Sequence, residues 1–255
     1  MLGGNSATDR PIWNKDDLLD PHAHGDKARR VRRMFDAIAP TYERVNTWSS
    51  AGRDRAWRRT AVKLAQVTAA DQVIDVACGT GDFARAFVEG GAGAVAGIDF
   101  AEDMLRRAAA RPTPRAAWCL GDALRLPFPD ASFSVASCAF GVRNFQDLTA
   151  GLAEMRRVLR PHGRAVLLEF SLPSSAVMRR LYRLYLERIM PHWAGLISGD
   201  RNGAYHYLAR SVVSFTDDSG MEQALRAARF ASIHRHPLTL GIVTVWLAYA
   251  CDDRS

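Results

Sequence analysis

From residue 72 onward, short apolar runs alternate with stretches whose apolar residues recur at helical spacing. The runs predict buried strands and the spaced stretches predict helices that cover them, an alternation typical of a parallel sheet. We therefore predict an α/β fold with a mostly parallel sheet. The predicted strands are Val73–Ala77, Ala94–Asp99, Ala116–Leu120, Phe133–Ala139 and Arg164–Phe170.

The segments around these strands predict further helices and a terminal hairpin. A length of 255 residues suits one large domain, placed at 27–255, with a helical insertion at about 174–215. Residues 1–26 are polar and are predicted to be flexible. The other predicted elements are helices within 27–70, a helix at Gln146–Leu159 ended by Pro161-His-Gly163, a helix near Met221–Arg229, and strands at Ala231–Pro237 and Ile242–Ala250.

The net charge of the chain is +7. Arginine supplies nearly all of the positive charge, because only Lys15, Lys27 and Lys63 are lysines. The basic clusters 27–33 and 53–59 suit contact with anionic lipid, or they are solvated helix faces. No aromatic stacking platform accompanies them, so nucleic acid is not a predicted partner. The oligomeric state, a homodimer included, stays open.

The sequence gives no sign of a membrane span or a metal site. No apolar run approaches the roughly 18 residues of a spanning helix, and the N-terminus has no signal-peptide or transit-peptide pattern. The expected location is the cytoplasm, with peripheral contact at the inner face of the membrane left open. The four cysteines form no C-x-x-C pair and no zinc-like spacing with histidine, so neither a disulfide nor a metal is expected.

The most informative segment is the turn after the first predicted strand, Val73-Ile-Asp-Val-Ala-Cys-Gly-Thr-Gly-Asp-Phe-Ala84. Gly79 and Gly81 lack a Cβ, so the backbone can turn sharply and a ligand can approach it closely. Asp99 ends the next strand, 24 positions after Asp75. This is near the ~20-residue spacing at which an acid meets a ribose hydroxyl. The pattern predicts a site for an adenosine-containing cofactor.

The acids around this turn indicate which cofactor binds. Asp75 and Asp82 would repel the pyrophosphate of a dinucleotide, although Gly79, Gly81 and Ala84 fit its fingerprint. Carboxylates instead suit the ammonium and sulfonium groups of S-adenosylmethionine. The alternatives are a helix cap at Asp82, a satisfied buried acid at Asp75, or a nicotinamide dehydrogenase.

Several segments together resemble the ubiquinone/menaquinone biosynthesis C-methyltransferase family over roughly residues 30–250. The resemblance implies a Rossmann-like class I methyltransferase with a seven-stranded, mostly parallel sheet and a terminal antiparallel hairpin. It also implies C-methylation of a prenylated quinol, with a demethylmenaquinol-type acceptor favoured. Besides Val73–Phe83, the segments that carry it are Phe35–Asn46, Gly121–Asp130, Ala139-Phe-Gly-Val-Arg-Asn144 and Tyr205–Ser211.

The chain departs from the family pattern at three places. Ala139 stands where a serine is common, Thr216 replaces a proline, and Leu240-Gly241 replaces paired glycines. None of these departures falls on a residue assigned to the reaction itself. They affect only the inference about which quinone is the substrate.

The resemblance also implies which residues bind the cofactor. Gly79, Thr80 and Gly81 are expected at its amino-acid part, Asp99 at the ribose, and Met104 on the adenine, where ordinary core packing is the alternative for Met104. Asp122 with Ala123 is expected at the adenine edge, and Tyr42 is expected to close over the sulfonium or to pack its helix on the domain. The full predicted set is Tyr42, Ala77, Gly79, Thr80, Gly81, Asp99, Phe100, Met104, Asp122, Ala123 and Ala139.

The acceptor must be activated, because an aromatic carbon is a poor nucleophile until a neighbouring hydroxyl ionises. A guanidinium beside that hydroxyl lowers its pKa by stabilising the anion. We predict that Arg143 favours the phenolate and that Asn144 orients the ring oxygen; both would contact the substrate. The alternative for Arg143 is a structural ion pair with an acid such as Asp147.

The helical insertion supplies the remaining candidates. Histidine is the side chain whose ordinary pKa suits a general base at neutral pH, so His206 is predicted either to act as one or to be a polar surface residue. Tyr205 and Tyr207 are predicted to contact the substrate, and the apolar residues of the insertion suit either an isoprenoid tunnel or a helix core. Two other functions stay open: O- or N-methylation of another small or lipophilic acceptor, and a non-enzymatic binding module.

Overall fold

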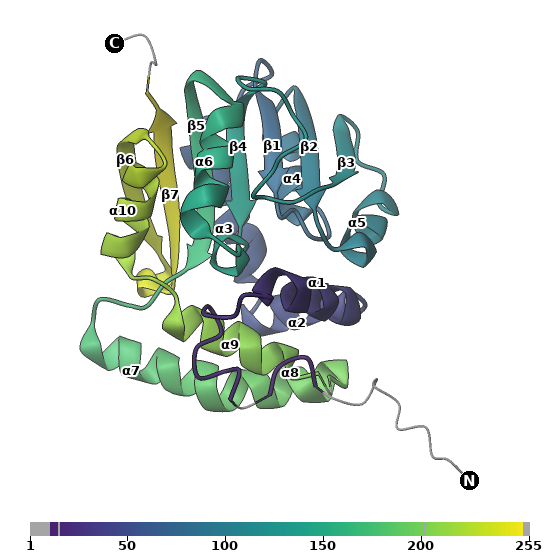
Figure 1. Ribbon diagram of the computed structural model, residues 1–255, viewed down its shortest axis with the longest axis vertical. Helices are drawn as coiled ribbons and strands as arrows, with labels where there is room; N and C mark the ends of the chain where they lie inside the picture. Colours follow the sequence, from purple (N-terminus) through teal and green to yellow (C-terminus); the bar gives the residue numbers. More distant parts are fainter. Residues whose placement is uncertain (1–10, 15, 201, 252–255) are drawn as a thin grey trace.

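The computed structural model describes residues 11–14, 16–200 and 202–251, so residues 1–10 of the segment predicted to be flexible lie outside it. Its centre is a seven-stranded sheet of order β3-β2-β1-β4-β5-β7-β6 (Figure 1). Only β7 runs antiparallel to its neighbours, which confirms the predicted α/β fold with a terminal antiparallel hairpin. The strands are β1 (Gln72–Val76), β2 (Ala94–Asp99), β3 (Ala116–Leu120), β4 (Phe133–Ala139), β5 (Leu159–Phe170), β6 (Phe230–Leu238) and β7 (Val243–Ala250).

Helices cover both faces of this sheet, because the central strands are apolar on both sides. On one face α6 and α10 pack around Leu152 and Leu225, and on the other α3 and α4 pack around Ala61 and Phe87. α5 packs beside β2 and β3. These helices are α3 (Arg53–Leu64), α4 (Asp82–Glu89), α5 (Glu102–Ala109), α6 (Leu148–Val158) and α10 (Asp218–Ala227).

The other helices form a cap beside the carboxyl ends of the parallel strands (Figure 1). They share a separate apolar cluster that includes Met34, Val45, Tyr182 and Leu208. The predicted insertion supplies a long helix that contains one π-helical turn. The cap consists of α1 (Lys27–Ile38), α2 (Tyr42–Ser49), α7 (Ala176–Leu184), the π turn η2 (Tyr185–Ile189), α8 (Met190–Ser198) and α9 (Ala204–Ser214).

The predicted start of β5 at Arg164 is wrong by five residues, since the strand begins at Leu159. Pro161-His-Gly163 was expected to end a helix at Leu159, but α6 ends at Val158 and β5 begins at the next residue. The register with β4 shifts between Phe133 and Val135, so residues 160–163 form a bulge. His162 has φ 61°, which lets the strand bend there without ending.

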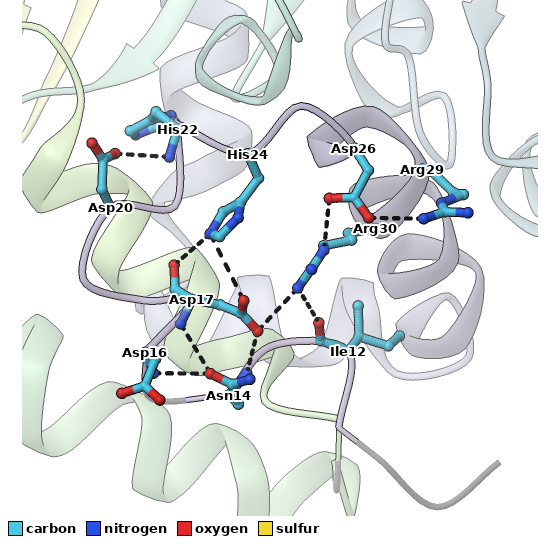
Figure 2. A network of polar contacts seen from close by, with 10 residues as sticks. All are labelled: Ile12, Asn14, Asp16, Asp17, Asp20, His22, His24, Asp26, Arg29 and Arg30. Carbon is cyan, nitrogen blue, oxygen red and sulfur yellow. Dashed lines mark hydrogen bonds and ion pairs between the residues drawn. The ribbon is translucent and has the colours of Figure 1, made fainter. Parts of the chain in front are cut away.

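Residues 11–14 and 16–26, which belong to the segment predicted to be flexible, pack against the cap. Figure 2 shows why its polar sequence still forms a fixed loop. The side-chain oxygen of Asn14 accepts from the backbone of Asp16 and Asp17, while Asp17 forms an ion pair with Arg30 at 3.0 Å. The polar residues satisfy one another, and Trp13 supplies the buried anchor at 2% exposure.

Candidate active site

The turn after β1 combines tight backbone geometry with an open surface. Ala77, Gly79 and Gly81 all have positive φ, at 54°, 56° and 83°. A Cβ on Gly79 would meet nothing within 4 Å, so its backbone is open to a ligand. A Cβ on Gly81 would lie 2.4 Å from the Trp118 ring. Gly81 is therefore needed for packing. Unlike Gly79 and Thr80, which were predicted beside it at the cofactor, Gly81 lines neither cavity at this turn.

Asp99 occupies the end of β2, where its carboxylate faces this turn. One oxygen accepts from the Gly79 N–H at 2.7 Å and the other from the Ala101 N–H at 2.8 Å. Burial raises the pKa of Asp99 to about 6, although these N–H groups favour the charged form. The carboxylate is held rigidly and keeps free lone pairs for a ligand.

A first cavity opens above Gly79 and Asp99. It collects residues from the loops that follow four neighbouring strands, which is the usual ligand position in open α/β sheets. The predicted cofactor residues that line it are Tyr42, Ala77, Gly79, Asp99, Phe100, Met104, Asp122, Ala123 and Ala139. Asn144, predicted at the acceptor, lines it as well.

A small recess adjoins the first cavity and contains Asp75, Thr80 and Asp82. Ser137 donates to one oxygen of Asp75 at 2.8 Å, and the other oxygen is buried without a hydrogen bond among the described residues. Burial raises the pKa of Asp75 to about 7. Because an unpartnered buried carboxylate is costly, this oxygen marks a place where a cationic or hydrogen-donating ligand group would fit.

A second cavity of about 380 Å³ lies between the sheet and the cap. Its wall is mostly apolar and comes from α2, α3 and the insertion; Asn46, Asp54, Arg58 and Arg143 are among its polar members. Tyr42 and Phe140 line both this cavity and the first one. The two spaces therefore adjoin at these two rings, so a ligand in one can meet a ligand in the other.

Arg143 lies in the wall of the second cavity in a buried ion pair. Its Nη1 donates to Glu169 Oε1 and to the Phe140 carbonyl, both at 2.6 Å. Burial opposes the charge, but Glu169 raises the pKa of Arg143 above its ordinary value. The pairing partner is thus Glu169, and Asp147 instead caps α6 by accepting from the Ala150 N–H.

Glu169 is a functional candidate that the sequence did not reveal. It follows Val166-Leu-Leu168 at the end of an apolar strand and is only 2% exposed. A lone acid ending a buried run is the signal that could have found it, since such an acid needs a buried cation. Phe140 has φ 57°, and its carbonyl accepts a hydrogen bond from Arg143, so the guanidinium helps to hold a strained turn.

The tyrosines and the histidine of α9 have different positions. Tyr205 lines the second cavity, and its hydroxyl is buried without a hydrogen bond among the described residues. Tyr207 lies behind the site and donates to Asn144 Oδ1 at 3.1 Å, so it orients Asn144 and lines neither cavity. His206 is exposed and lines neither cavity, because the helix turns it away from its two neighbours. A role as general base is not supported for it.

The N-terminal loop supports the turn that carries Arg143 and Asn144. Trp13 stacks on Tyr207 with ring centroids 4.2 Å apart. The Lys27 ammonium donates to the carbonyls of Arg143 at 3.0 Å and Phe145 at 2.6 Å. The loop and the start of α1 thus fix both the backbone and the side chains of the candidate acceptor residues.

Replacing Trp13 by alanine is expected to lower the free energy of unfolding by about 3–5 kcal/mol, because it removes a fully buried ring and leaves a cavity beside Tyr207. Urea denaturation would measure this loss. The matched control is Trp48→Ala, since Trp48 is 44% exposed and its replacement should cost much less. Equal losses in the two variants would contradict the supporting role of the loop.

Two features are absent from the part of the chain that the structure describes. Across residues 11–14, 16–200 and 202–251, no histidine, cysteine and carboxylate side chains gather into a group able to hold a metal ion. Over the same ranges, no helix has the length and apolar character needed to cross a bilayer.

Comparisons with known proteins identify relatives over most of the chain. The model of the ubiE/COQ5 methyltransferase family matches residues 23–250. A demethylmenaquinone methyltransferase of Deinococcus radiodurans is 45% identical over 226 residues, covering 87% of this chain and 93% of that protein. The ubiquinone/menaquinone biosynthesis C-methyltransferase UbiE of Geobacter sulfurreducens is 38% identical over 239 residues, covering 91% and 93%.

Solved structures agree on the architecture. The SAM-dependent methyltransferase of Thermotoga maritima aligns with a TM-score of 0.61, covering 85% of this chain and 98% of that one. Its sequence identity is 18%, so this likeness concerns the fold alone.

Proposed function

Because the chain belongs to the ubiE/COQ5 methyltransferase family, we propose that it transfers a methyl group from S-adenosylmethionine to a ring carbon of a prenylated quinol, with a demethylmenaquinol-type acceptor favoured. The observation that carries the proposal is the pair of adjoining cavities that meet at Tyr42 and Phe140. One has the carboxylates and open glycine backbone that suit a nucleoside, and the other is mostly apolar with two buried guanidiniums, those of Arg58 and Arg143.

The residues of the first cavity and its recess fit S-adenosylmethionine. Asp99 would accept from the ribose hydroxyls, and Met104, buried at 1%, would pack on the adenine. The unpartnered oxygen of Asp75, with Asp82 nearby, would receive the ammonium group of the methionine part. When bound, S-adenosylmethionine supplies a methyl group made electrophilic by the sulfonium.

Arg143 and Asn144 would prepare the acceptor. The charged guanidinium stabilises the phenolate of the quinol, which raises electron density at the neighbouring ring carbon. Asn144, held by Tyr207, lines the first cavity and not the second, so it would meet the ring oxygen where the two cavities adjoin. The acceptor carbon would bond to the transferred methyl group as the sulfur–methyl bond breaks, and it would then release its proton to water. Tyr42 and Phe140 flank the point where the two reactants meet.

The test is turnover of radiolabelled S-adenosylmethionine with reduced demethylmenaquinol and demethylated benzoquinol analogues presented in detergent. Label on the ring carbon of one acceptor supports the proposal and identifies the head group. Label on oxygen or nitrogen, or no transfer despite cofactor binding by calorimetry, would move the function to another acceptor.

Affinity for S-adenosylmethionine is expected to rise as the pH is raised through about 6, the pKa of Asp99. Only the ionised carboxylate can accept from two ribose hydroxyls, so protonation below that pH weakens binding. Asp99→Asn should weaken binding about tenfold or more and remove this pH step. Calorimetry from about pH 5 to 8 would measure both.

Asp75 titrates nearby, because burial raises its pKa to about 7. The change in affinity caused by the titration of Asp75 should persist in Asp99→Asn. That variant therefore separates the contribution of Asp75 from that of Asp99. A wild-type affinity independent of pH across this range would contradict the assigned role of Asp99.

A further inference from the structure

The outer side of the long cap helix carries a stripe of large apolar side chains that are exposed to solvent. Six large apolar side chains of α7, η2 and α8 are 43% to 71% exposed. Figure 1 shows this helix along the edge of the molecule farthest from the sheet. The six residues are Val177, Leu181, Leu184, Ile189, Trp193 and Leu196.

The π turn keeps this stripe on one side of the helix. The spacings within 177–184 and within 189–196 are four and three residues, which keep side chains aligned on an α-helix. The step from Leu184 to Ile189 is five residues and would rotate an unbroken α-helix by about 140°. The π turn Tyr185–Ile189 absorbs the additional residue, so the two halves of the stripe lie in line.

The charges beside the stripe have one predominant sign. Arg179, Arg180, Arg183 and Arg188 are all exposed on the same helix, and Glu187 is its single acid between residues 176 and 198. A helix with exposed leucine and tryptophan beside arginines is typical of a segment that lies in the interface of an anionic bilayer.

Two tryptophans extend the stripe onto the neighbouring helix. Trp193 of α8 lies 5.9 Å from Trp48 of α2 between ring centroids, and both are more than 40% exposed. Exposed tryptophan is costly in water but favourable at a membrane interface, where the ring is buried and its N–H stays near polar groups.

The same helix also forms a wall of the second cavity. Met178, Tyr182 and Leu186 line the cavity, and Leu181 both lines it and is 56% exposed. The cavity therefore reaches the surface at the apolar stripe.

We propose that the face formed by α7, η2, α8 and Trp48 docks on the surface of a bilayer that contains anionic lipid. The stripe enters the interface, the arginines contact the headgroups, and the mouth of the second cavity faces the lipid. This inference rests on the proposed function in one respect: a prenylated quinol would then pass from the bilayer into the cavity.

Vesicle co-sedimentation tests the surface directly, using phosphatidylethanolamine vesicles with and without phosphatidylglycerol. Leu184→Gln/Leu196→Gln should reduce the partition coefficient about tenfold or more, because both side chains are exposed and line no cavity. The matched control Leu184→Met/Leu196→Met should bind like the wild type. Arg180→Gln/Arg183→Gln should bind about tenfold more weakly to the anionic vesicles, while Arg107→Gln/Arg226→Gln on α5 and α10 should cause a smaller loss.

Fluorescence quenching by brominated lipid locates the contact. Trp48 and Trp193 are the tryptophans more than 40% exposed among the described residues, so they should be quenched most. Trp193→Phe should lose much of the quenching while it retains vesicle binding. Binding to neutral and anionic vesicles unaffected by either the leucine or the arginine double variant would overturn the proposal.

The two proposals fail in distinguishable ways. Methyl transfer to a short-tailed, water-soluble quinol without lipid tests the proposed function alone, and the leucine double variant should retain it. If that transfer occurs and the wild type stays unbound to vesicles, the surface inference is wrong. A wild-type dimer that the leucine substitutions convert to monomer, again without vesicle binding, would assign the stripe to contact between two copies of the chain.

Discussion

Replacing Arg143 by methionine is expected to lower kcat for methyl transfer about 10²- to 10³-fold while the affinity for S-adenosylmethionine stays near that of the wild type. Arg143 lines the second cavity and not the first, so its charge acts on the acceptor. Loss of the guanidinium leaves the phenolate without its stabilising cation. Single-turnover methyl transfer gives the rate, and calorimetry gives the affinity.

A matched control is Arg164→Met. Arg164 also forms an ion pair, with Asp71 at 3.0 Å, but it lies in β5 directly after the bulge and lines neither cavity. Its replacement should lower stability and leave kcat near the wild-type value. If Arg143→Met and Arg164→Met changed kcat equally, the phenolate role of Arg143 would be refuted.

The strands and the glycine turn could be predicted from sequence because each depends on a local pattern. β2, β3 and β4 have the predicted bounds, since apolar runs bordered by turn residues define both their ends. The bulge in β5 was missed because Pro161 and Gly163 are typical of a helix end. Only pairing with β4 shows that the chain continues as a strand there.

The partners of the site residues could not be predicted, because they come from segments far apart in the chain. Glu169 forms an ion pair with Arg143, which is 26 residues away in the chain, and Asn144 accepts a hydrogen bond from Tyr207, which is 63 residues away. Asp147, the acid suspected from sequence, lies close in the chain but faces the start of α6. Proximity in sequence was thus a poor guide to the ion pair.

The N-terminal loop shows that composition alone is a poor guide to whether a segment packs on the protein. Its polar composition is typical of a flexible segment, yet Trp13 supplies one large buried ring that offsets the entropy of ordering the loop. Asn14 and Asp17 then satisfy the polar groups around it (Figure 2). A single aromatic residue in a polar segment was the available signal.

Removing one partner of the Arg143–Glu169 ion pair is expected to destabilise the fold much more than replacing both partners. Glu169→Leu should lower the free energy of unfolding by about 3–5 kcal/mol, because it leaves the guanidinium buried without a counter-charge. Arg143→Met/Glu169→Leu should recover most of that loss, since apolar side chains can fill the same buried volume. Urea denaturation of the two single variants and the double variant would give the coupling energy.

The pH dependence of stability separates the two single variants. In Arg143→Met, Glu169 loses the cation that opposes the effect of burial, so its pKa rises further above the ordinary value. A raised carboxyl pKa in the native state means that the native protein holds a proton that the unfolded chain releases. Stability of Arg143→Met relative to the wild type should therefore increase as the pH falls through the raised pKa toward the ordinary value of 4.5. Glu169→Leu, which lacks the carboxyl, should show no such gain. Equal pH dependence in the two variants would show that Arg143 does not influence the titration of Glu169. A double variant that is stable but catalytically inactive would show that the guanidinium acts in the reaction and that Glu169 serves to hold it in position.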